Sequence, residues 1–204
     1  MKWMWAAMPR GSSKRRCALV FLGPLLSHVL LSAQPSSDAL SRVRFLQQLV
    51  NAAVERTRHS VRYDPAYVGI PYPNGDVPAD TGVCTDEIIR AYRAVGVDLQ
   101  KEVYADMKQN FSSYPEKAKG RSKPDRNIDH RRVPNLMVFF ERKGESLPAT
   151  RRAEDYKPGD LVTYDLGGGV PHIAIVADQK GASGAYKIVH NIGEGPKMED
   201  VLFR

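Results

Sequence analysis

The sequence is poor in cysteine, with only Cys17 and Cys84 among 204 residues. It also lacks a C-x-x-C pair, an H-E-x-x-H motif and a phosphate-binding glycine loop followed by lysine. These absences leave a metal or nucleotide site without a specific signal. There is no internal repeat, and no second long hydrophobic run follows the N-terminal one. We therefore expect no metal, no cofactor and no membrane span in the mature chain.

The first 33 residues have the pattern of an export signal. Basic residues such as Lys2 and Arg10, with three more at positions 14–16, precede an apolar run from Cys17 to about Leu31. That run is short for a membrane span and ends beside small residues. The pattern predicts a signal peptide over residues 1–33, cleaved after Ala33, and a periplasmic or secreted mature protein. An uncleaved N-terminal anchor is the alternative.

Charge argues against a nucleic-acid partner. The whole chain has a formal net charge of +7, but residues 1–33 hold five basic and no acidic residues, so 25 basic and 23 acidic residues remain. The densest basic run, residues 117–126, contains Gly, Pro and Ser and is typical of a solvated loop. Binding of an anionic wall polymer there is the alternative. Residues 34–204 suit one domain, which we expect to be monomeric.

Hydrophobic periodicity indicates where the elements lie. Apolar stripes at helical spacing predict helices over residues 38–58, 84–95, 99–111 and 134–142. Short apolar runs bounded by glycine and proline predict strands over residues 161–164, 172–177 and 186–190. Helices come first and an antiparallel sheet last, so the fold class is expected to be α+β.

One thiol and two histidines are the candidate catalytic residues. Cys84 opens a predicted helix, and a helix N-terminus or a nearby imidazolium lowers a thiol pKa from about 8.5. His172 begins one strand and His190 ends the next, so an antiparallel pairing brings them together. A nucleophile, a base and an orienting residue follow from this arrangement. Asn191 is the alternative orienting residue, because successive strand residues face opposite sides.

Each of these residues also has a simpler explanation. Cys84 can be a buried core residue, since unpaired cysteine is commonly buried, and the histidines can be ordinary strand residues. A zinc site built from Cys84, His130, His172 and His190 is a weaker alternative, because their spacing fits no zinc motif.

The order of motifs carries a resemblance. A cysteine-headed helix, Pro-Gly-Asp-Leu-Val at 158–162, His-Ile-Ala-Ile-Val at 172–176 and Val-His at 189–190 together resemble the NlpC-type cysteine peptidases of the papain-like clan. Those enzymes cleave peptide bonds in peptidoglycan stem peptides. The resemblance implies a papain-like core with Cys84 as nucleophile, His172 as base and His190 as the third residue. It also implies that Tyr72, twelve positions before the cysteine, lies near the oxyanion.

A second resemblance covers the whole chain. The run Asp-Arg-Asn-Ile-Asp-His-Arg-Arg-Val-Pro-Asn at 125–135 is similar to the YijF-like family, a group of secreted bacterial proteins of unassigned function. Within this run, His130 and Arg131 form a cluster suited to binding a substrate carboxylate. A salt-bridged loop is the alternative interpretation of the same cluster.

The chain also departs from these patterns. NlpC-type enzymes carry Asp-Cys-Ser-Gly, whereas this chain has Val83-Cys84-Thr85-Asp86. CHAP-type amidases of the same clan, which the start of this helix also resembles, use an acidic third residue where this chain has His190. We expect an exported cysteine hydrolase of amide bonds in peptidoglycan or another cell-wall peptide. The alternatives are a catalytically silent wall-binding or periplasmic scaffold, and an acyl or peptidyl transferase with the same triad.

Overall fold

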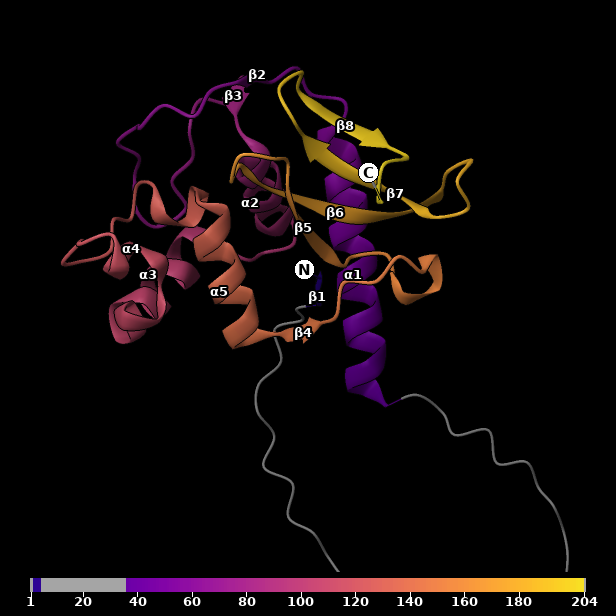
Figure 1. The fold of residues 1–204 in the computed structure, drawn as a ribbon, viewed down its shortest axis with the longest axis horizontal. Helices are drawn as coiled ribbons and strands as arrows, with labels where there is room; N and C mark the ends of the chain where they lie inside the picture. The colour runs from indigo at the N-terminus through magenta and orange to yellow at the C-terminus, as the bar shows by residue number, and fades with distance from the viewer. Residues whose placement is uncertain (1, 5–35, 204) are drawn as a thin grey trace, which may run out of the picture.

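The computed structural model describes residues 2–4 and 36–203. A six-stranded sheet has the order β4-β1-β5-β6-β7-β8, and β2 and β3 form a separate parallel pair (Figure 1). The helices are α1 (Ser37–Arg56), α2 (Cys84–Ala94), α3 (Leu99–Asn110), α4 (Pro115–Ala118) and α5 (Val133–Lys143). The strands are β1 (Lys2–Met4), β2 (Arg62–Tyr63), β3 (Thr81–Gly82), β4 (Glu145–Leu147), β5 (Leu161–Asp165), β6 (Pro171–Lys180), β7 (Tyr186–Asn191) and β8 (Pro196–Glu199).

The expected α+β class is confirmed, and the four predicted helices correspond to α1, α2, α3 and α5 with ends shifted by at most two residues. The three predicted strands are the central β5, β6 and β7, which pair antiparallel with one another. The sequence pattern missed α4, β4 and β8, and also the β2–β3 pair. Each of these spans four residues or fewer, which is too short for a periodic pattern to develop.

Side-chain caps fix the starts of two helices. The Ser36 hydroxyl accepts a hydrogen bond from the Ala39 amide at the start of α1. The Asp98 carboxylate accepts from the Lys101 amide at the start of α3. Each cap satisfies an amide that the helix leaves unpaired.

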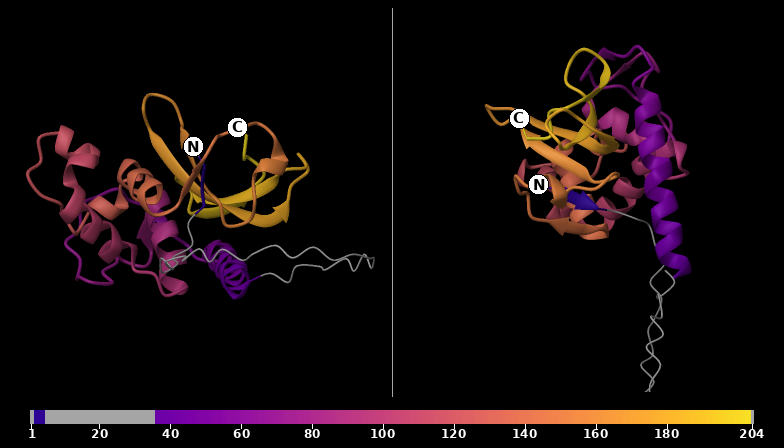
Figure 2. Two further views of the ribbon diagram at one scale, coloured as in Figure 1. Left: turned by 90° about the horizontal axis from the view of Figure 1, so that it is seen from below. Right: turned by 90° about the vertical axis from the view of Figure 1, so that its right-hand side faces the viewer.

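Both faces of the central sheet are covered. α1 and α2 lie against one face, with α3, α4 and α5 grouped to one side (Figure 2). On that face Leu161, Ile173, Ile175 and Val189 join the large core shared with the helices. On the other face, a smaller cluster consists of Tyr156, Val162, Ala174, Val176, Ala185, Ile188 and Leu202. The alternation of strand residues therefore decides whether a side chain faces the helices or the smaller cluster.

Of the predicted export segment, residues 1–33, the structure describes only residues 2–4. Lys2–Met4 forms β1 and pairs with both β4 and β5, and the remainder of the segment, residues 5–33, lies outside the described residues. Signal cleavage therefore stays a prediction. Of the helices that the structure does describe, none is both long and apolar enough to cross a membrane.

Two glycines offer a test of how α1 packs on the sheet. Gly159 (φ +89°) and Gly184 (φ +82°) both have left-handed backbones, but a Cβ would meet another residue only at Gly159, 2.9 Å from Leu46 of α1. Alanine at either position loses about 1 kcal/mol of stability, because a residue with a Cβ is strained in the left-handed backbone conformation. We expect Gly159→Ala to lose about 2 kcal/mol of unfolding free energy and Gly184→Ala about 1 kcal/mol, measured by urea unfolding. Equal losses would show that α1 does not press on this turn.

Candidate functional site

Cys84 is the first residue of α2, and its sulfur is enclosed by hydrogen-bond donors. The backbone amides of Ile173, Thr85 and Cys84 itself donate to the sulfur. The Tyr63 side chain also lies beside it, since the pairing of β2 with β3 places Tyr63 opposite Gly82, and burial together with the neighbouring Cys84 raises the pKa of Tyr63. The cysteine side chain joins the large core, and the residue is 4% exposed. The thiol is therefore held between the start of α2, the start of β6 and the end of β2.

Burial dominates the protonation of this thiol. Loss of solvent is the largest cause that raises the pKa of Cys84, and with the smaller contribution of the Asp86 charge it outweighs the three amides, which lower it, to give about 11. The amides at the start of the helix lower this pKa, as predicted, but removal of the thiolate from water outweighs them, so the net shift is upward. At neutral pH the resting thiol keeps its proton.

The two histidines form a hydrogen-bonded chain with a glutamate. His172 Nε2 lies 3.0 Å from His190 Nδ1, and His190 Nε2 lies 2.8 Å from a Glu199 carboxylate oxygen. Because a carboxylate only accepts, Nε2 of His190 carries the proton and its Nδ1 accepts from His172. His172 therefore has its proton on Nε2, and its Nδ1 presents a free lone pair. The pairing of β6, β7 and β8 brings these three residues together.

The hydrogen-bonded series of His172, His190 and Glu199 forms one wall of an apolar cavity of about 260 Å³. Burial, and to a smaller extent the neighbouring His190, lower the pKa of His172 to about 4. The His172 ring also packs against the Tyr164 ring, with their centroids 6.2 Å apart. The resting imidazole is therefore uncharged. The other walls of the cavity are Tyr164, Leu166, Ile188, Ile192 and Val201.

The thiol and the imidazole approach the start of β6 from different sides. Ile173, whose amide donates to the sulfur, packs with the helices. His172, the preceding residue, faces the side where Tyr164 and Ile188 lie. Among residues 36–203, no hydrogen bond joins the sulfur to an imidazole. Within the described residues, the resting site therefore holds an uncharged thiol and an uncharged base that both lie at the start of β6 but share no hydrogen bond.

A buried ion pair fixes the start of α2. Arg131 donates to both carboxylate oxygens of Asp86, from Nε at 2.8 Å and from Nη2 at 2.9 Å. Asp86 also accepts from the Val83 amide, and the Thr85 hydroxyl donates to the Arg131 carbonyl. The predicted substrate-binding role of Arg131 is wrong, because its side chain is 2% exposed and already paired. Asp86, which departs from the peptidase pattern, is the partner that holds it.

His130 is likewise not placed to bind a substrate carboxylate. It is 2% exposed, and its Nδ1 is buried without a hydrogen-bond partner among the residues that the structure describes. Burial lowers the pKa of His130 to about 4, so the ring is neutral at physiological pH. The predicted binding role is wrong for both members of the pair, because the fold buries them beneath the surface that a substrate can reach.

The predicted roles of Tyr72 and Asn191 are also corrected. The Tyr72 ring packs edge-on against Tyr104 of α3, 5.3 Å between centroids, and Tyr63 is the tyrosine that contacts the thiol. Asn191 is fully buried and accepts from the Gly193 amide in its own turn. His190, the preferred candidate, is the residue that contacts His172.

Two functional candidates were missed by the sequence interpretation. Tyr63 lies in a two-residue strand within a proline-rich loop, and Glu199 ends a four-residue strand that no periodicity indicated. The available signal for Glu199 was an acidic residue nine positions after His190, at a distance that a tight hairpin spans. In the described part of the chain, no three His, Cys, Asp or Glu side chains are grouped as metal ligands.

Residues 50–204 match the model of a family described as a domain of unknown function, DUF1287. The chain belongs to the DUF1287 family. It is 43% identical over 186 residues to a relative described as "Uncharacterized protein YijF" from Escherichia coli (strain K12), covering 91% of this chain and 90% of the relative. The resemblance to YijF-like proteins is therefore confirmed. No solved structure matches this DUF1287 chain.

Slow alkylation of the folded thiol is the first test of the site. In a Cys17→Ser background, we expect iodoacetamide to label native Cys84 at pH 7.5 at least tenfold more slowly than free cysteine, because the thiol pKa is about 11. The rate should rise up to about that pH. The same chain unfolded in urea, followed by mass spectrometry, should react like free cysteine. Rapid labelling of the folded protein at pH 6 would contradict this arrangement.

Acid should destabilise the fold through its buried histidines. His130 and His172 have folded pKa values of about 4, so between pH 6.5 and 4 the unfolded chain binds more protons. The stabilisation is complete above pH 6.5 and is lost as the pH falls through 4, by roughly 2–3 kcal/mol per histidine. We expect His130→Gln to flatten the pH dependence of urea unfolding. His59→Gln, at an exposed position, should leave it unchanged, and identical profiles would contradict the assignment.

Proposed function

We propose that this protein is an exported cysteine hydrolase that cleaves an amide bond in cell-wall peptide, using a papain-like core and acting as a monomer. The observation that carries the proposal is the chain from Glu199 through His190 to His172. It leaves Nδ1 of His172 as an uncharged acceptor at the start of the strand whose Ile173 amide contacts Cys84. Buried histidine pairs ended by a carboxylate are typical of an oriented general base.

The proposed reaction follows from these groups. Cys84 attacks the carbonyl carbon while its proton moves to Nδ1 of His172, and the amides beside the sulfur with the Tyr63 hydroxyl stabilise the oxyanion. His172 then returns the proton to the leaving amine as the C–N bond breaks. Water, deprotonated by His172, hydrolyses the resulting thioester and regenerates the thiol. His190 and Glu199 keep the base in the required tautomer throughout.

Peptidoglycan stem peptides are the proposed substrate class. The resemblance to NlpC-type peptidases supports this choice, and so does the apolar cavity beside the base, whose Leu166, Ile192 and Val201 walls suit a small aliphatic side chain. Such a side chain next to the scissile bond would place the carbonyl close to His172. The export signal would deliver the domain to the compartment that holds this substrate.

A second candidate is a catalytically silent wall-binding protein. The observation that favours it is the pair of pKa values, about 11 for the thiol and about 4 for the base, which makes a charged pair unfavourable at rest. A transferase with the same triad is the third candidate, and it differs only in using an amine in place of water.

Digestion of purified peptidoglycan separates these candidates. We expect fragments that have gained the mass of water, no fragments with Cys84→Ala, and a 10²–10⁴-fold slower reaction with His172→Ala. Glu199→Gln should slow the reaction about tenfold or more, because His190 would no longer be held in the tautomer that carries its proton on Nε2. Glu194→Gln is the matched control, because Glu194 lies on the same hairpin and, within residues 36–203, has Lys197 as its one ion-pair partner. Fragment masses are read by mass spectrometry.

Three outcomes would contradict the hydrolase. Products joined through a new amide would indicate transfer, and intact peptidoglycan at every protein concentration would indicate a silent fold. Equal losses from Glu199→Gln and Glu194→Gln would remove the support for the oriented base.

A further inference from the structure

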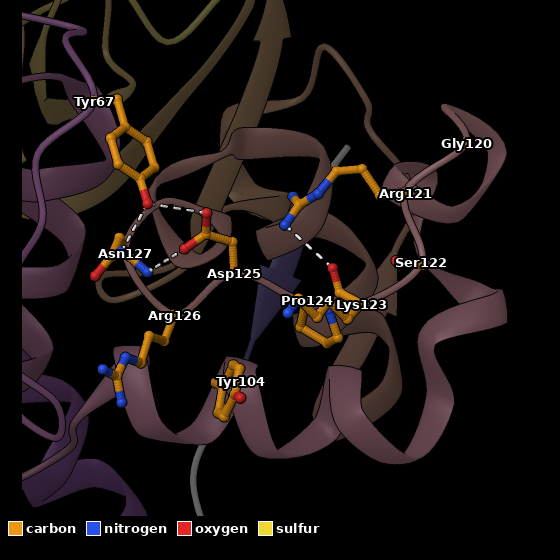
Figure 3. A pocket seen from close by; sticks show the side chains of 10 residues that line it. All are labelled: Tyr67, Tyr104, Gly120, Arg121, Ser122, Lys123, Pro124, Asp125, Arg126 and Asn127. Carbon is orange, nitrogen blue, oxygen red and sulfur yellow. Dashed lines mark hydrogen bonds between the residues drawn. The ribbon is translucent and has the colours of Figure 1, made fainter.

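A second hollow of about 590 Å³ lies between α3 and the loop of residues 120–127, and is called here the loop pocket (Figure 3). Its walls combine two tyrosine rings with basic and amide side chains, which differs from the apolar cavity beside His172. The residues that matter below are Tyr67, Tyr104, Lys123, Asp125, Arg126 and Asn127.

The Tyr67 ring is exposed but rigidly held. It is 58% exposed, yet its hydroxyl donates to Asp125 and accepts from the Asn127 side chain (Figure 3). Asp125 in turn accepts from the Asn127 amide, which closes the cluster. An exposed aromatic face fixed in advance can stack on a ligand at a small entropic cost.

The second aromatic wall is similarly supported. The Tyr104 ring packs edge-on against Tyr72, and the Lys108 ammonium lies 5.9 Å from its centroid. Beneath the loop, the Asp129 carboxylate accepts from the Asp125 amide at 2.6 Å and pairs with Arg121. The loop that closes the pocket is therefore anchored to the protein.

The positive charges of the pocket are not all balanced. Arg121 is paired with the carboxylates of Glu116 and Asp129. In the described residues, Lys123 and Arg126 have no ion-pair partner, and the Arg126 guanidinium lies 5.7 Å from the Tyr72 ring centroid. Two unpaired cations beside fixed aromatic faces favour a ligand that has both a flat apolar surface and a negative charge.

We propose that the loop pocket binds a carboxylate-bearing sugar of the wall glycan. The C–H face of a sugar stacks on Tyr67 and Tyr104, and its carboxylate binds Arg126 and Lys123. Single-stranded nucleic acid also uses aromatic stacking and basic charge. The pocket offers two unpaired cations around a single hollow, without a basic groove that follows a strand, so one acidic sugar fits better.

The loop pocket lies within reach of the thiol. Tyr63 contacts Cys84 and Tyr67 lines the pocket four residues later, a separation of at most about 14 Å along an extended chain. Arg131 fixes the segment between Tyr63 and Tyr67, because it donates a hydrogen bond to the Ala66 carbonyl. The same side chain pairs with Asp86 at the start of α2. If the proposed hydrolase function holds, a peptide-free acidic sugar in the pocket keeps the peptide attached to a neighbouring sugar of the same strand near the site. Binding of the sugar does not itself depend on that function.

The test is a calorimetric titration of the full chain carrying Cys84→Ala, which prevents turnover. The probe is glycan strands stripped of peptide by an amidase, so that their lactyl carboxylates are free. We expect binding that weakens with salt, about fivefold loss with Arg126→Gln, and no change with Arg58→Gln, an exposed arginine at the end of α1. Tyr67→Ala should lose about tenfold, and Tyr67→Phe, which keeps the ring face, should lose less.

Other outcomes would overturn the proposal. Equal binding of a neutral N-acetylglucosamine oligomer would remove the carboxylate requirement, and equal binding of oligothymidylate would indicate general polyanion binding. Equal effects of Arg126→Gln and Arg58→Gln, or no binding by folded Tyr67→Phe, would exclude this pocket. Glycan binding without peptide cleavage by the wild type would contradict the hydrolase alone, and cleavage without glycan binding would contradict the pocket alone.

Discussion

The ion pair between Arg131 and Asp86 is the interaction on which the site depends. Both side chains are 2% exposed, so neither charge has water as an alternative partner, and removal of one partner from such a pair typically costs 3–5 kcal/mol. The pair joins three segments that are distant in sequence: the start of α2 with Cys84, the helical turn at 129–131, and the segment after Tyr63, whose Ala66 carbonyl Arg131 also holds. The same ion pair therefore fixes both the helix start that carries the thiol and the segment that leads to Tyr67 in the loop pocket.

The same enclosure that positions the thiol also suppresses its ionisation. A helix start and three backbone amides favour a thiolate at Cys84, yet its pKa is raised to about 11 because the sulfur has lost its contact with water. His172 shows the matching effect, since burial disfavours the imidazolium even though His190 and Glu199 orient the ring. Orientation and ionisation are therefore separate properties here, and the fold supplies the first without the second.

Local pattern was enough to locate the main elements but not their partners. Periodicity identified four helices and the three central strands, and the rule that neighbouring antiparallel strands bring opposite ends together correctly paired His172 with His190. Glu199 and Tyr63 were missed because they lie in short strands whose existence depends on pairing with distant segments. Arg131 was misjudged for a related reason: a basic residue in a charged loop looks available to ligands until the fold supplies a buried carboxylate.

The two pKa values limit how such a site can work. Transfer of a proton from a group with a pKa of about 11 to one with a pKa of about 4 is uphill by roughly 10 kcal/mol, at 1.36 kcal/mol per unit. A turnover near 10 per second corresponds to a total barrier of about 16 kcal/mol, so little would remain for bond formation. In the proposed hydrolase, a substrate that filled the cavity beside His172 and brought its carbonyl dipole to the sulfur would change both environments at once. Proton transfer coupled to attack on that carbonyl avoids the free ion pair, because the charge passes directly to an oxyanion that the amides and Tyr63 can bind. The closed resting site is thus compatible with catalysis only if the substrate itself completes it.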